Sequence, residues 1–242
     1  MRVPRVYVEA DLRRGSEAVL GEDAATHLAR VLRLRAGDPV TLFNGDGRDY
    51  SGRLAGLTKH DARVTVGTAG DAEPEPPLAI ALAIGVSRGE RMDFVIQKAV
   101  ELGVAGIQPL LTERSVVRLD GERADRRHAH WRGVLVAACE QSGRRRLPVL
   151  EPAVAWRAWA LPADGMRLLL DPGAEASLPM LSTPGGRVTL LVGPEGGLTE
   201  AERMRATRGG FTPVRLGPRI LRTETAPLAA LAAIQALWGD LR

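Results

Sequence analysis

The sequence is poor in the features that mark secreted, membrane-bound and metal-dependent proteins. Its one cysteine, Cys139, excludes an intramolecular disulfide and a cysteine-rich zinc site, and its alanine neighbours indicate a packed thiol. No His, Cys and carboxylate residues have metal-ligand spacing, so we expect no metal. No apolar run approaches the roughly 20 residues that cross a bilayer, and the first residues lead into no signal-peptide core. We therefore expect a cytoplasmic protein with no membrane attachment.

Lysine is also scarce, since almost all of the 33 basic residues are arginine. Arginine favours bidentate contacts to phosphate. The basic excess lies in residues 76–147, which carry 12 basic and 8 acidic groups. Two interpretations stay open for this charge: a solvated helix face, or a surface that binds nucleic-acid phosphate.

Common cofactor motifs are missing as well, because the chain has neither a G-x-x-x-x-G-K-[ST] loop nor a G-x-G-x-x-G turn after its first parallel strand. Residues 85–89 do match G-x-S-x-G, the nucleophile elbow of many hydrolases. Such a hydrolase needs a later histidine, yet only His128 and His130 follow Ser87, and both lie in a charged helix. A polar turn in which Ser87 or Arg88 reaches an anion is the better interpretation, with a hydrolase as the weaker alternative.

Hydrophobic periodicity divides the chain in two. Residues 1–70 predict short antiparallel strands around hairpin turns, with one helix at 22–32. Residues 71–77 are acidic and proline-rich, which is typical of a linker. From residue 78 to 242, apolar strands alternate with helices, which predicts an α/β domain with a parallel sheet covered on both faces. The helices expected there are at 91–102, 121–141 and 225–238, with a short one around Trp156 and Trp159.

Two of the expected strands end in turns rich in glycine and proline. The strand at 187–192 runs into the turn at 193–197, and the strand at 211–216 runs into the segment 217–226. Carboxyl ends of parallel strands meet at one sheet edge, so we expect these turns to form neighbouring ligand-binding loops. Glycines of this kind also occur as plain structural punctuation. Against that alternative, each turn holds a glutamate, and the second adds two arginines and two threonines.

These turns resemble a known family. Residues 191–198 and 216–226 look like the motifs of ribosomal RNA small subunit methyltransferase E, a SPOUT-class family. The resemblance covers essentially the whole chain, and its further matches are at residues 27–33, 87–92, 97–103 and 138–144.

The resemblance implies a PUA-like, β-barrel RNA-binding domain at 1–70, a linker at 71–77 and a SPOUT methyltransferase domain with a trefoil knot at 78–242. It implies a homodimer with a role in ribosome biogenesis. The implied reaction is methyl transfer from S-adenosylmethionine to N3 of a uridine in the decoding region of 16S ribosomal RNA. The implied partner is that RNA or the small ribosomal subunit. The knot and the reaction rest on the resemblance alone.

The cofactor is expected in the loops at the sheet edge, where glycine permits close backbone approach and apolar neighbours exclude water from the sulfonium. The residues expected to bind S-adenosylmethionine are Leu170, Val192, Gly193, Pro194, Glu195, Gly196, Gly197, Leu216, Gly217, Ile220, Leu221, Arg222, Thr223, Thr225 and Ala226.

Three charged residues are the candidates for the chemistry. Arg222 is expected to stabilise the uracil anion or position the base, while Glu195 or Glu224 accepts the N3 proton or orients Arg222. An arginine stays protonated, so it is a poor base but a good electrostatic partner. The alternative is an internal ion pair between Arg222 and Glu224 that only shapes the loop.

Basic side chains and the last helix supply the expected partner surfaces. Apolar residues of the final helix exceed what one sheet face needs, which fits a dimer interface as well as a core role. A non-catalytic ribosome-assembly protein would share the basic content, and only the intact loops argue for catalysis. The residues expected to bind RNA are His27, Arg30, Arg33, Arg88, Arg91, Lys98, Arg114, Arg144, Arg145 and Arg146.

Overall fold

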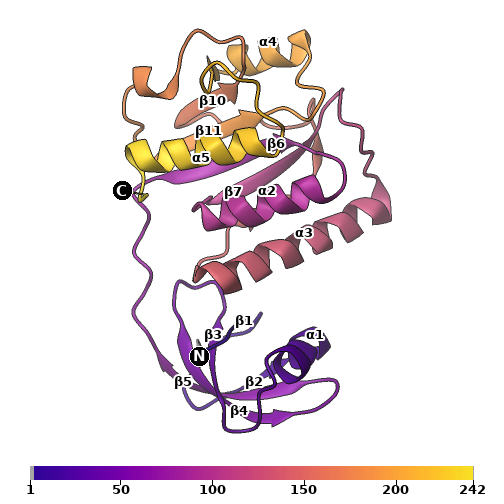
Figure 1. Ribbon diagram of the computed structural model, residues 1–242, viewed down its shortest axis with the longest axis vertical. Helices are drawn as coiled ribbons and strands as arrows, with labels where there is room; N and C mark the ends of the chain where they lie inside the picture. Colours follow the sequence, from indigo (N-terminus) through magenta and orange to yellow (C-terminus); the bar gives the residue numbers. More distant parts are fainter. Residues whose placement is uncertain (1–2, 242) are drawn as a thin grey trace. The chain divides into compact units, whose positions relative to one another are not determined.

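The computed structural model describes residues 3–241, which divide into two compact units. The first unit comprises the residues up to Glu75 together with Cys139–Leu147. The second comprises Pro76–Ala138 and the residues from Pro148 onward. Each unit has its own sheet (Figure 1). The segment Cys139–Leu147 therefore belongs with the N-terminal sheet although it follows the linker in sequence.

The first unit is built on a five-stranded sheet with the order β1-β3-β4-β5-β2. β1 runs parallel to β3, and the other neighbouring pairs are antiparallel. Alternate strand residues face a core that also receives Leu28, as the period of two predicts. The strands are β1 (Arg5–Tyr7), β2 (Glu17–Leu20), β3 (Pro39–Phe43), β4 (Tyr50–Leu57) and β5 (Ala62–Ala69).

The helix expected at 22–32 is present but changes its winding. It begins as α1 (Glu22–Thr26) and continues as the π-helical turn His27–Val31. Ala25 and Leu28 face the core, whereas His27 and Arg30 are exposed. The apolar spacing therefore predicted the buried face correctly, and the wider turn was not foreseen.

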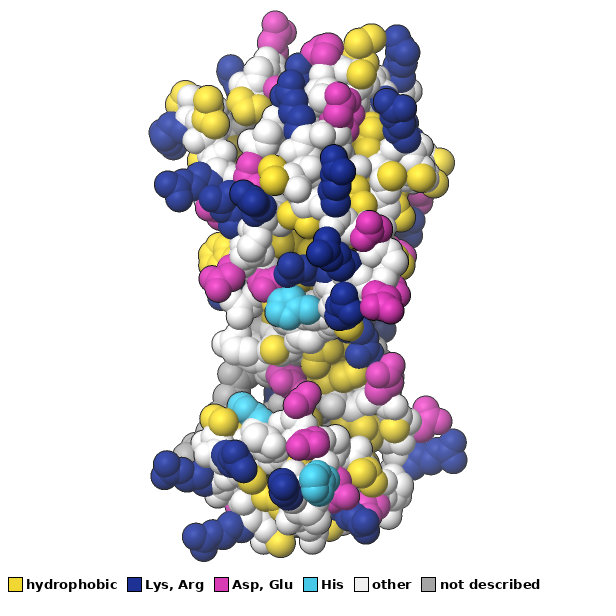
Figure 2. Space-filling view, turned by 90° about the vertical axis from the view of Figure 1, so that its right-hand side faces the viewer, with side chains coloured by type: hydrophobic (Ala, Val, Ile, Leu, Met, Phe, Trp, Pro, Cys, Tyr) yellow, Lys and Arg dark blue, Asp and Glu magenta, His cyan; other side chains and the backbone are white. Residues whose placement is uncertain are grey.

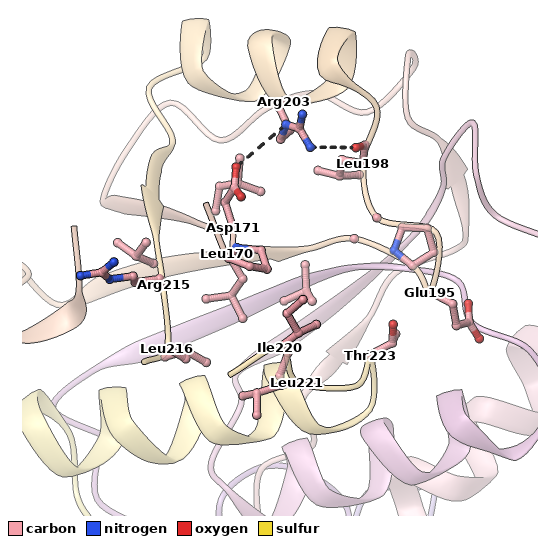
Figure 3. A pocket seen from close by; sticks show the side chains of 18 of the residues that line it. Leu170, Asp171, Glu195, Leu198, Arg203, Arg215, Leu216, Ile220, Leu221 and Thr223 are labelled. Atoms are coloured by element: carbon pink, nitrogen blue, oxygen red, sulfur yellow. Dashed lines mark hydrogen bonds and ion pairs between the residues drawn. The ribbon is translucent and has the colours of Figure 1, made fainter. Parts of the chain in front are cut away.

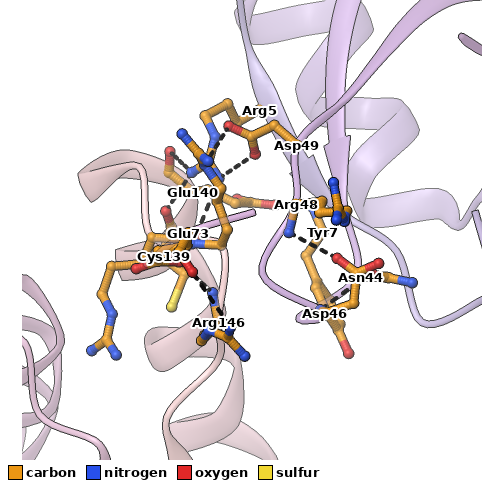
Figure 4. Close-up of polar contacts among 12 residues, drawn as sticks. Arg5, Tyr7, Asn44, Asp46, Arg48, Asp49, Glu73, Cys139, Glu140 and Arg146 are labelled. Atoms are coloured by element: carbon orange, nitrogen blue, oxygen red, sulfur yellow. Dashed lines mark hydrogen bonds and ion pairs between the residues drawn. The ribbon is translucent and has the colours of Figure 1, made fainter. Parts of the chain in front are cut away.

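A buried arginine connects the segment Cys139–Leu147 to this sheet (Figure 4). The Arg5 side chain is only 7% exposed and lies 2.7 Å from the Asp49 carboxylate. It also donates hydrogen bonds to the carbonyls of Cys139 and Arg144, at 2.7 and 3.1 Å. A buried cation is costly unless it is paired and hydrogen-bonded, and these acceptors meet that need. Cys139 is buried beside it, and this burial raises the pKa of the thiol to about 11, as expected for a packed cysteine.

The second unit is built on a seven-stranded, all-parallel sheet, which confirms the predicted α/β class. The strand order is β12-β10-β11-β6-β7-β8. β9 also pairs with β7, nearer the carboxyl end of that strand than β8 does. The strands are β6 (Ala79–Gly85), β7 (Gly106–Leu111), β8 (Val149–Leu150), β9 (Val154–Ala155), β10 (Met166–Leu170), β11 (Arg187–Val192) and β12 (Thr212–Val214).

Helices cover both faces of this sheet, as the continuous apolar strands require (Figure 1). α4 lies on one face, where Ala206 and Phe211 pack against Leu169 and Leu191. α2 and α5 pack together on the other face. The helices are α2 (Glu90–Glu101), α3 (Gly121–Ser142), α4 (Glu200–Arg208), α5 (Thr225–Trp238) and the short 3-10 helix η2 (Leu178–Met180).

The register of the central strands brings four strand ends to one edge. Ile84 of β6 pairs with Val192 of β11, and Leu170 of β10 pairs with Val214 of β12. The loops after these strands therefore start side by side, as expected from the two glycine-proline turns.

Other expectations are corrected or stay open. The short helix expected around Trp156 is a turn, and the strand expected at 211–216 is ordered as a strand only at Thr212–Val214. The trefoil knot stays a prediction. Among residues 3–241, no helix is both long and apolar enough to cross a membrane.

Candidate active site

The loop after β11 folds closely against the end of β6, and glycine makes this contact possible. A Cβ atom on Gly85 would lie 2.5 Å from the Pro194 nitrogen, and one on Gly193 would lie 3.0 Å from the Leu198 nitrogen. Gly197 has a φ of +67°, a left-handed conformation that side chains rarely adopt. Glycine is thus required at position 193 by close backbone contact and at position 197 by the left-handed φ.

A pocket of about 240 Å³ opens between this loop and the loops after β10 and β12 (Figure 3). Its wall is largely backbone and aliphatic side chains, including Leu170, Leu216 and Ile220. All of the residues expected to bind the cofactor line it except Gly196, Arg222 and Thr225. Their role in binding stays a prediction, but the pattern did bring these loops together.

Several residues that line the pocket were not predicted. Arg203 of α4 lies 3.9 Å from the Asp171 carboxylate and donates to the Leu198 carbonyl at 3.4 Å (Figure 3). A sequence signal for this helix exists, because Thr199 and Glu202 form a capping box at its start. The other unpredicted lining residues are Leu169, Pro172, Val214, Arg215 and Arg219.

Arg91, which is among the residues expected to bind RNA, lies beside both candidate catalytic carboxylates. Its guanidinium is 3.0 Å from the Glu195 carboxylate and 3.9 Å from that of Glu224. The backbone N–H of Arg88 also donates to Glu195, at 3.0 Å. The start of α2 therefore holds the loop after β11 and the segment before α5 through one arginine.

Arg222 is not part of this group of ion pairs. Its side chain is exposed, and in the part of the chain that the structure describes it makes no hydrogen bond or ion pair. The backbone carbonyl of Arg222 accepts hydrogen bonds from Thr225 and Ala226, which fixes the main chain at the start of α5. The alternative in which Arg222 pairs with Glu224 is not the arrangement observed, because Glu224 faces Arg91.

Glu195 is held in its ionised form. Burial raises the pKa of Glu195, but hydrogen bonds from the backbone N–H groups of Arg88 and Glu195 and from the Arg91 side chain outweigh it. The net result is a pKa below the usual value for glutamate. A carboxylate with a lowered pKa is a weaker proton acceptor.

The residues expected to bind RNA fall into separate groups. Arg88, Arg91 and Arg114 lie at the pocket loops, and Arg114 donates to the Gly196 carbonyl at 2.9 Å. Lys98 pairs with Glu101 on α2 at 2.8 Å.

The remaining candidates belong to the first unit. His27, Arg30 and Arg33 are exposed on and after the π-helical turn. Arg145 is paired with Asp49 at 3.4 Å, and Arg146 is paired with Glu75 at 2.9 Å. The backbone carbonyl of Arg144 accepts a hydrogen bond from Arg5. RNA binding by all ten residues stays a prediction.

The hydrolase alternative lacks the contact that it requires. Ser87 is buried, and its hydroxyl has no hydrogen-bond partner among the described residues. His130 lies 2.7 Å from Asp93 instead. A nucleophilic serine needs a hydrogen-bonded base, and none is present here. Within residues 3–241, no cluster of His, Cys, Asp and Glu is arranged to hold a metal ion.

Comparison with known proteins identifies relatives across the full length. A family model described as an RNA methyltransferase domain matches residues 74–235, and an RNA methyltransferase PUA domain matches residues 20–67. Ribosomal RNA small subunit methyltransferase E of Bacillus subtilis strain 168 is 32% identical, with 98% of this chain and 99% of the relative aligned. Its counterpart in Buchnera aphidicola from Schizaphis graminum is 31% identical, with 99% and 98% aligned.

Solved structures agree with these sequence matches. The crystal structure of a ribosomal RNA small subunit methyltransferase E from Neisseria gonorrhoeae bound to S-adenosyl methionine is 42% identical. It aligns over all of both chains with a TM-score of 0.91. A putative methyltransferase from Legionella pneumophila, in complex with the bound cofactor S-adenosylmethionine, is 36% identical and aligns over all of both chains with a TM-score of 0.92.

The contacts of Glu195 predict how its titration responds to two neighbouring substitutions. We expect Arg91→Ala to raise the pKa of Glu195, because a charged hydrogen-bond donor to the carboxylate is removed. Arg88→Ala is the matched control, since its contact with Glu195 comes from a backbone N–H that alanine retains. The side-chain carboxyl of Glu195 can be followed by NMR across an acid titration of each variant.

The sign of the associated stability change follows from linkage. A folded-state pKa below the unfolded one means that ionised Glu195 stabilises the fold above its unfolded pKa. This contribution is lost as the pH falls through the lower, folded-state pKa. It should be smaller in Arg91→Ala than in Arg88→Ala. Equal pKa values for Glu195 in the two variants would contradict the role given to Arg91.

Proposed function

Because the chain belongs to the ribosomal RNA small subunit methyltransferase E family, we propose that it methylates N3 of a uridine in the decoding region of 16S ribosomal RNA. The proposed methyl donor is S-adenosylmethionine, and the proposed partner is that RNA or the small ribosomal subunit. The observation that carries the proposal is the pocket at the carboxyl edge of the parallel sheet. It has the position and lining expected of a site for a nucleoside-containing cofactor.

The lining residues fit S-adenosylmethionine on two grounds. Gly193 leaves no room for a Cβ atom because Gly197 and Leu198 lie against it, and this tight loop lines the pocket with glycine backbone that a ligand can approach closely. The Ile220 side chain is 85% exposed although it lines the pocket, and a ligand that fills the pocket would bury part of this apolar surface. When bound, the cofactor would supply an electrophilic methyl group, and the apolar side chains of Leu170 and Leu216 would help to exclude water from the pocket.

Arg222 is proposed to stabilise the negative charge that develops on the uracil ring. Transfer to N3 requires that this nitrogen lose its proton, which leaves an anionic base. The Arg222 guanidinium has no ion-pair partner among the described residues. It can therefore bind that anion without first breaking an internal ion pair. Its permanent charge excludes Arg222 as the proton acceptor.

Glu224 is proposed as the group that accepts the N3 proton. Glu195 receives two hydrogen bonds at 3.0 Å and has a lowered pKa, so it is the poorer base. Within residues 3–241, the only polar contact of the Glu224 carboxylate is the longer one of 3.9 Å with Arg91. This difference supports a division of roles in which Glu224 takes the proton and Glu195, through Arg91, fixes the loop.

The final helix supports a homodimer as part of the proposal. α5 is apolar along most of its length, and Leu237 is 41% exposed in the single chain. A second copy of this chain would cover such a face. Sedimentation velocity measures the assembly state, and a chain that stays monomeric at assay concentrations would remove the dimer from the proposal.

The cofactor assignment predicts saturable binding of S-adenosylmethionine by calorimetric titration. Gly197→Leu should weaken binding at least tenfold, about 1.4 kcal/mol, because a side chain at this lining position intrudes on the pocket. Gly186→Leu is the matched control. Gly186 also has a left-handed φ, of +88°, and open space around its Cβ position, but it does not line the pocket.

The outcomes separate catalysis from a purely structural role in ribosome assembly. Binding that survives in Gly186→Leu and disappears in Gly197→Leu supports the pocket as the methyl-donor site. A folded wild-type protein that binds RNA but not S-adenosylmethionine would instead be an assembly factor with a vestigial pocket.

The role of Arg222 predicts a kinetic signature. Arg222→Ala should lower the single-turnover rate of methyl transfer to small-subunit ribosomal RNA by about 10²–10³-fold, as for removal of one donor to a developing anion. Affinity for S-adenosylmethionine should change little. Arg222→Lys should restore part of the rate, since the charge returns without the planar fork. Full turnover in Arg222→Ala with an intact fold would show that Arg222 is not catalytic.

A further inference from the structure

A second hollow, of about 490 Å³, lies at the start of α3 in the same unit as the pocket, and arginine dominates its lining. Arginine and histidine side chains gather on the face of the molecule that Figure 2 turns toward the viewer, where α3 begins. We call this hollow the arginine cleft. It is lined by Val117, Arg118, Leu119, Arg123, Arg126, Arg127 and His130.

Most of the positive charge in the arginine cleft is not neutralised by the protein. Arg126 pairs with Glu122 at 3.1 Å, and His130 lies 2.7 Å from Asp93. Arg118 and Arg123 form no side-chain hydrogen bond or ion pair within residues 3–241. Arg127 lies over the Trp131 ring at 6.0 Å and likewise pairs with no carboxylate of the described chain.

Uncompensated guanidinium groups that share one hollow repel each other, and an anion between them relieves this repulsion. Arginine has a planar fork of donors that matches the oxygens of a phosphate group. Several such groups side by side fit a ligand with successive phosphates better than a single small anion. The backbone of a nucleic acid is such a ligand.

The arginine cleft is connected to the pocket through two elements. The loop after β7 contacts the loop after β11 through Arg114, which donates to the Gly196 carbonyl at 2.9 Å. The loop after β7 also supplies Arg118. α2 makes the second connection, because Arg91 contacts Glu195 while Asp93 contacts His130. An RNA strand that presents a base at the mouth of the pocket can therefore place its neighbouring phosphates in the arginine cleft.

We propose that the arginine cleft binds the phosphodiester backbone of the substrate RNA next to the nucleotide that is methylated. This inference rests on the proposed function and adds Arg118, Arg123 and Arg127 to the residues expected to contact RNA. The contacts are to backbone phosphate, so they contribute affinity and position the strand without reading its sequence.

The test compares RNA binding by two double variants with the same loss of charge. Arg118→Gln with Arg123→Gln removes two of the unpaired charges of the cleft. Arg157→Gln with Arg208→Gln removes the charges of two exposed arginines of the same unit outside it. The probe is labelled, deproteinised small-subunit ribosomal RNA, titrated at several salt concentrations. For the cleft variant we expect weaker binding and a slope of log K against log salt that is smaller by about 0.7–0.9 for each lost contact.

The outcomes decide the proposal without depending on catalysis. An unchanged salt slope for the cleft variant would overturn the proposal, and so would an equal change in the control variant. If the cleft binds an acidic protein segment instead of RNA, the salt slope of the cleft variant will be unchanged. Arg118→Lys with Arg123→Lys should retain most of the wild-type slope, because the charges remain. Calorimetry with S-adenosylmethionine on the same proteins separates the two claims: a wild type that fails to bind it contradicts the proposed function, while the RNA slope still decides the cleft.

Discussion

The ion pairs of Arg91 set the geometry on which the candidate site depends. One guanidinium faces Glu195 in the loop after β11 and Glu224 just before α5, at 3.0 and 3.9 Å. Because these groups are partly exposed, each pair contributes only about 0–1 kcal/mol to stability. The main consequence is positional, since two loops far apart in sequence are held against the start of α2. One cation facing two carboxylates also leaves an excess negative charge, which suits a cationic sulfonium donor nearby.

The sheet edge could be predicted from sequence because a local pattern determines it. Apolar runs that end in glycine and proline mark buried strands with tight turns, and parallel strands place those turns on one side. The strand order could not be predicted in this way. The neighbours β12-β10-β11-β6 depend on crossovers between distant segments, and periodicity carries no information about them. The family resemblance supplied the expected fold, because the same loops occur in proteins of known architecture.

Two features that the sequence did not predict, the turn around Trp156 and the position of Arg203, depend on contacts with residues that are distant in sequence. A helix was expected around Trp156 and Trp159, yet these carbonyls accept hydrogen bonds from Arg205, at 3.0 and 2.8 Å. The arginine satisfies groups that a helix would otherwise pair, and it stacks over the Trp156 ring. The position of Arg203 in the pocket also depends on distant contacts. The capping box shows where α4 begins, but the packing of α4 on the sheet is what brings its first turn to Asp171.

In a chain whose basic residues are nearly all arginine, the number of arginines does not identify those that bind an anionic ligand. Their partners do. Arg5, Arg91 and Arg146 each form an ion pair with a carboxylate of the protein itself, so an RNA phosphate would have to compete with that carboxylate for them. Arg222 and the cleft residues Arg118 and Arg123 have no such partner in the described chain. The reaction proposed here involves two anions, a uracil that loses its proton and a phosphodiester backbone. The unpaired arginines at the start of α5 and at the start of α3 supply a positive charge for each of them.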